Sequence, residues 1–177
     1  MKTKTSILSA GFLALVLALP VVQANAATPT NEVTVSMQEA KATAYQLSEN
    51  ADRLHAITRS GGHSWQSHSW YLDSVREDVN QLGKMLSNLE DLKAVASPSQ
   101  QLGIERMRPQ LVQTADSLEN AIQLLNERRH HVYFSEYGDA VETVSQQAAS
   151  MHQTLDAVLD YESAKARLDG LELSAGS

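Results

Sequence analysis

Residues 65–89 read WQSHSWYLDSVREDVNQLGKMLSNL, and this stretch decides the fold. Its mainly apolar side chains recur at alternating steps of three and four residues. They are Trp65, His68, Leu72, Val75, Val79, Leu82, Leu86 and Leu89. This spacing predicts a long helix that buries one face, because positions three and four apart lie on the same side of an α-helix.

The same heptad spacing appears in three further segments. The first contains Met37, Ala40, Ala44, Leu47, Ala51, Leu54 and Thr58. The third contains Ile104, Met107, Leu111, Thr114, Leu118, Ala121 and Leu125. The fourth contains Val141, Val144, Ala148, Met151, Leu155 and Val158. Breakers separate the segments, so we predict bundled helices over about 36–60, 64–95, 98–132 and 139–169.

The breakers are short and carry turn and capping residues. Ser60-Gly61-Gly62 can end the first helix with a left-handed glycine. Ser97, Pro98 and Gln100 form the pattern of a capping box with proline at the first helical position. Short connections make neighbouring helices antiparallel, so the predicted fold class is all-α, an up-down-up-down four-helix bundle. Pro109 should kink the third helix.

The N-terminus has the three parts of a secretory signal peptide. Lys2 and Lys4 precede the apolar run 7–19, and Ala24-Asn25-Ala26 is a small-x-small cleavage site. We expect cleavage after residue 26, which leaves residues 27–177 as a single bundle domain; an uncleaved anchor is the alternative. The protein is thus expected to be exported, to the periplasm or the extracellular space, with no membrane span after cleavage.

Composition narrows the class of protein further. The chain of 177 residues has no cysteine, which excludes disulfides and covalent c-type haem. Its formal net charge is −7, and loss of the signal lysines makes the mature chain more acidic. An acidic domain repels phosphate backbones, so we expect no nucleic-acid partner. No catalytic motif stands out, so we predict a non-enzymatic protein.

The up-down topology gathers unusual residues at one end of the bundle, where the first and third helices end. We call it the histidine-rich end. Its histidines are His55, His63, His68, His130 and His131. Its aromatic side chains are Trp65, Trp70, Tyr71, Tyr133, Phe134 and Tyr137. Because Trp and Tyr are enriched at interfaces, we predict a binding surface formed by Trp65, Trp70, Tyr71, Tyr133 and Tyr137. It would bind an envelope or secreted protein or peptide, or mediate self-association.

A metal site at this end is the alternative, with a transition metal such as Zn or Cu held by His55, His63, His68 and His131. The competing interpretation is that His68 lies in the core and bonds a hydroxyl such as that of Tyr137. Glu127 and His130 form an ExxH pair like those of di-iron bundles, but their heptad positions face outward. No facing pair of haem ligands is evident, so no cofactor is expected apart from that metal alternative.

Overall fold

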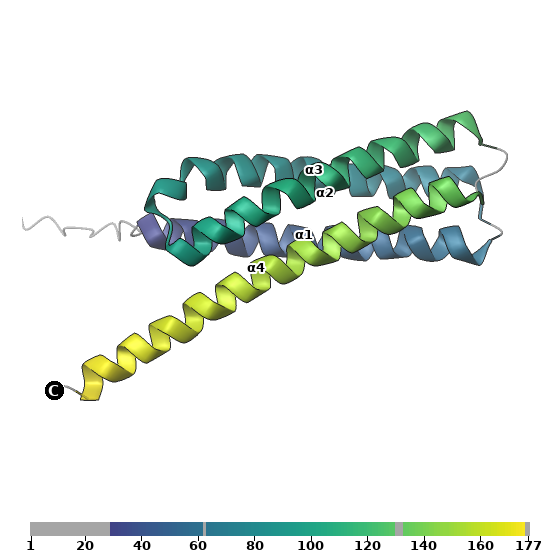
Figure 1. The fold of residues 1–177 in the computed structure, drawn as a ribbon. Coiled ribbons are helices and arrows are strands. Elements are labelled where there is room, and N and C mark those ends of the chain that lie inside the picture. Colours follow the sequence, from purple (N-terminus) through teal and green to yellow (C-terminus); the bar gives the residue numbers. More distant parts are fainter. Residues whose placement is uncertain (1–28, 62, 130–132, 176–177) are drawn as a thin grey trace, which may run out of the picture.

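The structure is a computed structural model that describes residues 29–61, 63–129 and 133–175. The described chain forms four α-helices and one short 3-10 helix (Figure 1). They are α1 (Pro29–Ser60), α2 (Trp65–Asp91), η1 (Lys93–Val95), α3 (Pro98–Glu127) and α4 (Ser135–Ala175). Consecutive helices pack together, and α4 returns to pack against α1. The all-α prediction is confirmed, and these contacts are consistent with an up-down bundle.

The predicted heptad positions form the core. The heptad positions predicted in the four segments are all buried, except that Thr58, Trp65 and Val158 are partly buried. The buried seam of α1 contains three alanines, Ala40, Ala44 and Ala51. Small side chains allow close approach of neighbouring backbones, and both α2 and α4 pack against this helix. A single apolar core therefore joins all four helices.

The predicted helix boundaries are correct at two turns. Gly61 has a φ of 69°, the left-handed conformation expected after α1. At α3, the Ser97 hydroxyl accepts from the backbone N–H of Gln100, and the Gln100 side chain accepts from the backbone N–H of Ser97. This capping box, with Pro98 at the first helical position, fixes the turn opposite the histidine-rich end.

Other helix boundaries differ from the predicted ones. Helix α1 begins at Pro29 rather than near residue 36, because Val33 extends the buried seam one turn before Met37. Helix α4 begins at Ser135 rather than near 139, and it continues through Gly170 to residue 175 rather than ending at 169. Helix α2 ends at Asp91, short of 95, and η1 follows.

Two further predictions involve residues that the structure does not describe. Helix α3 ends at Glu127 rather than at 132, and residues 130–132 lie outside the described part of the chain. The predicted signal peptide, residues 1–26, lies outside it as well. Within the described residues, no helix has both the length and the apolar character needed to cross a membrane.

Helix α4 is the longest helix and reaches beyond the bundle. Figure 1 shows its C-terminal part projecting past the turn between α2 and α3. Glu162 anchors α4 near this turn, because its carboxylate accepts hydrogen bonds from the hydroxyls of Ser97 and Ser99. Although partial burial opposes the change, these hydrogen bonds lower the pKa of Glu162. Every described side chain from Ser163 to Ser174 is exposed.

Candidate binding surface at the histidine-rich end

The centre of the histidine-rich end is a buried polar pair between α2 and α4. His68 and Tyr137 are both fully buried, and His68 Nδ1 lies 3.0 Å from the Tyr137 hydroxyl. The structure confirms the interpretation that His68 is a core residue bonded to Tyr137. The prediction that Tyr137 belongs to the binding surface is wrong, because its side chain is buried in the core. Burial lowers the pKa of His68 to about 4, with a smaller contribution from the nearby His63. Burial also raises the pKa of Tyr137. Both side chains are therefore neutral at pH 7.

Tyr133 joins the two connections at this end. Its hydroxyl donates a hydrogen bond of 2.7 Å to the backbone carbonyl of His63, which lies between α1 and α2. The Tyr133 ring also meets the edge of the His68 ring, with 5.9 Å between centroids. This side chain is nevertheless 46% exposed. It serves as a structural link and still presents part of its ring to solvent.

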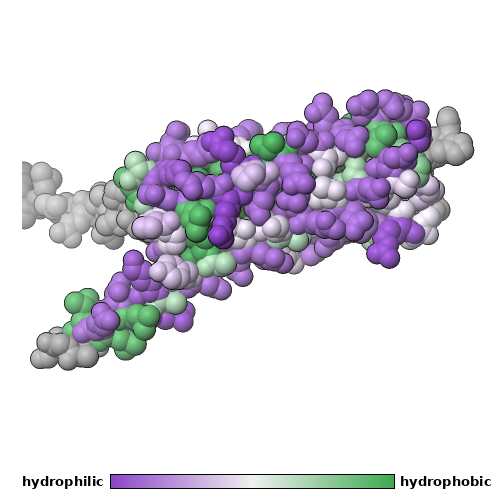
Figure 2. Space-filling model, in the orientation of Figure 1, coloured by the Kyte–Doolittle hydropathy of each residue, from purple (hydrophilic) through white to green (hydrophobic). Residues whose placement is uncertain are grey.

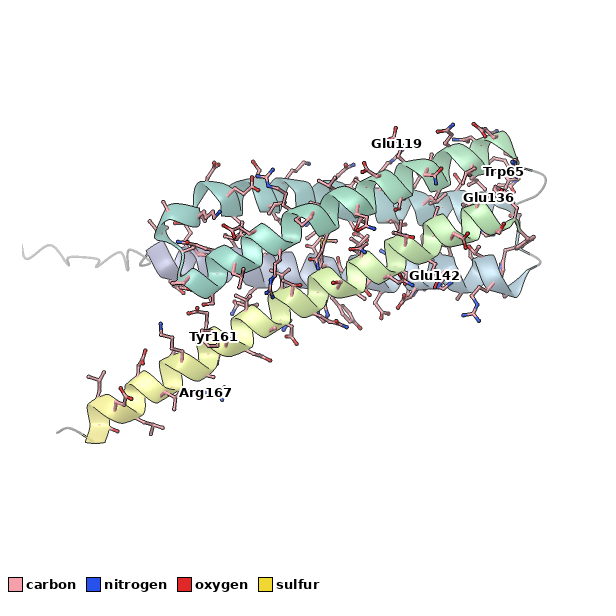
Figure 3. The ribbon with its side chains drawn as sticks, viewed as in Figure 1. Trp65, Glu119, Glu136, Glu142, Tyr161 and Arg167 are labelled. Atoms are coloured by element: carbon pink, nitrogen blue, oxygen red, sulfur yellow. The ribbon has the colours of Figure 1, made fainter. Side chains whose placement is uncertain are left out.

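Two arginines at the end of α3 cover aromatic rings. The Arg129 guanidinium carbon lies 5.0 Å from the centre of the Trp65 ring, and that of Arg128 lies 4.6 Å from the Phe134 ring. Cation–π contacts of this kind fix flexible arginine side chains on a surface. Figure 3 shows Trp65 and Glu136 at this same end of the molecule. Trp65 is half-buried and packs against the core, so it supports the surface more than it contributes to it.

Trp70 is the most exposed aromatic side chain of the described residues, with 62% of it accessible. Its ring meets the half-buried Tyr71 ring edge-on, with 4.8 Å between centroids. Trp70 is therefore accessible, as its assignment to a binding surface requires. An edge-to-face contact with a neighbour that itself packs on the core restricts the tryptophan ring without covering it.

The predicted histidine ligands do not form a group in the described chain. His55 is partly buried and lines a hollow with Arg59 and Glu142, His63 is exposed, and His68 is buried. No three or more His, Asp or Glu side chains among the described residues are placed to hold a metal ion. His131 lies outside these residues, so the metal alternative stays a prediction from the sequence.

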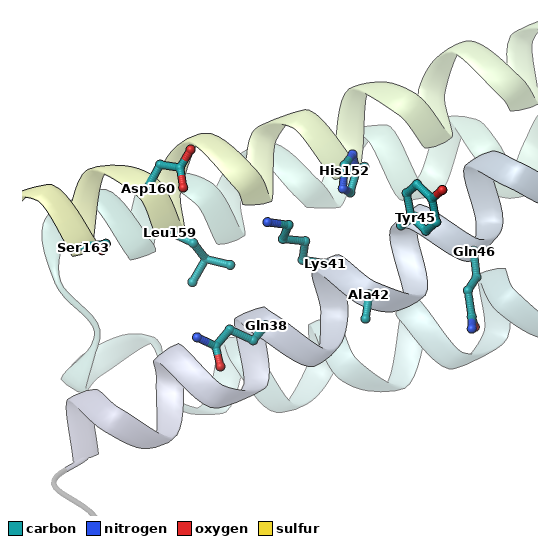
Figure 4. A pocket seen from close by; sticks show the side chains of 9 residues that line it. All are labelled: Gln38, Lys41, Ala42, Tyr45, Gln46, His152, Leu159, Asp160 and Ser163. Carbon is teal, nitrogen blue, oxygen red and sulfur yellow. The ribbon is translucent and has the colours of Figure 1, made fainter.

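A crevice between α1 and α4 was not predicted from the sequence. It has a volume of about 670 Å³ and lies where α4 begins to diverge from α1 (Figure 4). Its lining residues are Gln38, Lys41, Ala42, Tyr45, Gln46, His152, Leu159, Asp160 and Ser163. Lys41 forms an ion pair with Asp156, and this contact lowers the pKa of that carboxyl. The crevice depends on how the two helices cross, which heptad spacing does not specify.

No protein-family model, curated protein or solved structure matches this chain. The class of protein is therefore defined by its fold alone, as an all-α protein of four packed helices.

Proposed function

We propose that this protein is an exported, non-enzymatic protein that binds a protein or peptide partner at its histidine-rich end. The observation that carries the proposal is the exposed Trp70 ring, held edge-on against Tyr71. A large ring that is already restricted loses little conformational entropy when a partner covers it. Such rings are typical energetic centres of protein interfaces.

The surroundings of Trp70 also support a binding role. Tyr133 adds a second partly exposed ring at the same end, and its hydrogen bond to the His63 carbonyl braces the loop between α1 and α2. His68 and Tyr137 are buried at this end, bond each other and are covered by the core. They stabilise the end of the bundle, and a ligand at the surface cannot reach them.

Site-specific photocrosslinking in the producing cells tests this proposal. A photoreactive phenylalanine at position 70 should yield a discrete adduct with one partner, and the Tyr71→Ala variant should weaken that adduct. The matched control is the same probe at Leu102, an apolar side chain that is 46% exposed near the start of α3. Equal adducts at both positions, or none at position 70, would contradict the proposal.

The intact mass of the chain recovered in that experiment tests export at the same time. We propose cleavage after Ala26, so the recovered chain should begin at Ala27. A chain that retains residues 1–26 would contradict the proposed signal peptide and favour an uncleaved anchor.

We also propose that α3 bends at Pro109, which lies in the interior of this helix. A proline ring cannot donate to the carbonyl four residues earlier and collides with it. The seam positions Met107 and Leu111 are buried on either side. A crystal structure of the mature chain would test the bend, and a straight helical axis through this proline would contradict it.

A further inference from the structure

We infer that the projecting part of α4 is a second interaction surface, which pairs in parallel with the same segment of another copy of this chain. This segment, residues 160–175, is called the α4 extension. It lies at the end of the molecule opposite the histidine-rich end (Figure 1), so the inference does not depend on the proposed function.

The heptad pattern of α4 shifts where the bundle ends. Up to Val158 the seam faces the core, and its next position would be Glu162. The later positions in that phase are also charged, namely Lys165, Asp169 and Glu172. The α4 extension therefore cannot continue the core of its own bundle, because each further turn would bury a charged side chain.

A new apolar stripe replaces the old seam. Its described members are Ala157, Tyr161, Ala164, Leu168 and Leu171, spaced by alternating steps of four and three residues. All five are exposed, Leu168 and Leu171 by 61% and 65%. Figure 2 shows hydrophobic residues gathered on the projecting end of α4, while the bundle in this view is largely hydrophilic.

This stripe faces away from α1. The residues of α4 that line the two hollows beside α1 are His152, Leu159, Asp160, Glu162, Ser163 and Ala166. Apart from Asp160, they lie on the opposite side of the helix from Leu168, since each residue advances the direction by about 100°. The stripe is consequently directed away from α1, and a second molecule can reach it there.

The length of the α4 extension also favours an interaction with a second molecule. Sixteen residues form a helix about 24 Å long. In proteins, most of the stability of a helix comes from the packing of its apolar face rather than from helix propensity. Pairing the apolar stripe would supply the packing that the extension does not receive from its own bundle.

Charges beside the stripe favour a second copy in parallel orientation. With Tyr161 and Leu168 at the a positions of a heptad, Asp160 and Arg167 occupy g while Lys165 and Glu172 occupy e. In a parallel pair, g faces the e position five residues later in the other helix. Asp160 would then face Lys165 of the other copy, and Arg167 would face its Glu172. Symmetry doubles each contact, which gives four pairs of opposite charge.

The antiparallel orientation matches less well. In an antiparallel pair, e positions face e positions of the other helix and g positions face g positions. If Leu168 packs against Leu171 of the other copy, Lys165 and Glu172 are the only residues of opposite charge that face each other. A lipid surface is also a poorer occupant, because residues 160–174 carry four acidic and two basic side chains. Anionic membranes attract helices whose polar face is basic.

Sedimentation of the mature chain tests the inference. The pairing covers about two heptads, which is less than a standard interface, so we expect a monomer–dimer equilibrium between about 10 µM and 1 mM. Leu168→Asp should weaken the association about tenfold or more while leaving the thermal midpoint of the bundle unchanged, since this side chain is exposed. Lys165→Glu should weaken it too, and the double variant Asp160→Lys/Lys165→Glu should restore it.

Cysteine crosslinking determines the orientation, because the chain has no cysteine of its own. In a parallel pair Ala164 faces Ala164 of the other copy, so Ala164→Cys should form a disulfide-linked dimer rapidly. The matched control is Ala166→Cys, which is exposed on the side of the helix away from the stripe. Equal crosslinking of the two variants, or a monomer throughout the concentration range, would overturn the inference. The inference would also be overturned if the chain stays monomeric and binds neutral or anionic phospholipid vesicles through Leu168.

Discussion

At the scale of single residues, the pair of His68 and Tyr137 should make the stability of the bundle depend on pH. The pKa of His68 is about 4 in the folded chain, against an ordinary value of 6.5. Between these values the unfolded chain binds a proton that the folded chain does not. The stability contributed by neutral His68 is complete above about pH 6.5 and is lost as the pH falls towards 4. The loss should be about 3 kcal/mol.

Chemical denaturation at several pH values measures this effect. The wild-type unfolding free energy should fall from pH 7 to pH 4 more steeply than that of His68→Leu. At pH 7, Tyr137→Phe should cost about 1–3 kcal/mol, because it removes the hydrogen-bonding partner of a buried ring nitrogen. The double variant should recover part of that cost. A His68→Leu variant with the full wild-type pH dependence would show that another group is responsible.

At the scale of the helices, Gly103 of α3 leaves no room for a side chain beside Met37 of α1 and Val158 of α4. A Cβ atom added there would lie 2.9 Å from Cγ2 of Val158 and 3.0 Å from Cε of Met37. The branched valine side chain has little freedom to move away. Gly103→Ala should therefore destabilise the bundle by about 1 kcal/mol, since overpacking outweighs the gain in helix propensity.

Gly83 provides the matched control, because it is also inside a helix but has open space around its Cα. Gly83→Ala should stabilise the chain by about 0.5–1 kcal/mol. Urea titrations monitored by helical circular dichroism compare the two variants. Adding Val158→Ala to Gly103→Ala should reduce the penalty of the glycine substitution. If both alanine substitutions stabilise the protein, the close approach at Gly103 is not real.

The sequence predicts the helices well because their cores follow from local spacing. Heptad positions such as Leu82, Met151 and His68 are buried as expected. Tyr137, a predicted member of the binding surface, is buried as well, because it lies four residues before the seam position Val141. Helix ends are harder to predict, because an exposed glycine such as Gly170 costs a helix only about 1 kcal/mol and need not end it. The crevice beside Tyr45 depends on helix crossing, which is a property of tertiary packing.

At the scale of the whole molecule, the two ends differ in kind. The histidine-rich end is closed by a buried pair, a tyrosine link and two arginines over aromatic rings. The opposite end is anchored at Glu162, and the described side chains of α4 from Ser163 to Ser174 are exposed. Without disulfides, the stability of the bundle rests on one shared core. The α4 extension takes no part in that core, so its stability should be independent of the stability of the bundle.

Hydrogen exchange resolved by residue tests this separation. In a dilute, monomeric sample, amides after Glu162 should exchange at least about a thousandfold faster than those around Leu47 and Ala51, because only the latter require opening of the core. At concentrations that favour the dimer, the amides around Leu168 should become protected, whereas those of Leu168→Asp should not. Strong protection of the extension in the monomer would mean that it folds back onto its own bundle. The apolar stripe would then be covered within one molecule, which would contradict the proposed parallel pairing of two copies.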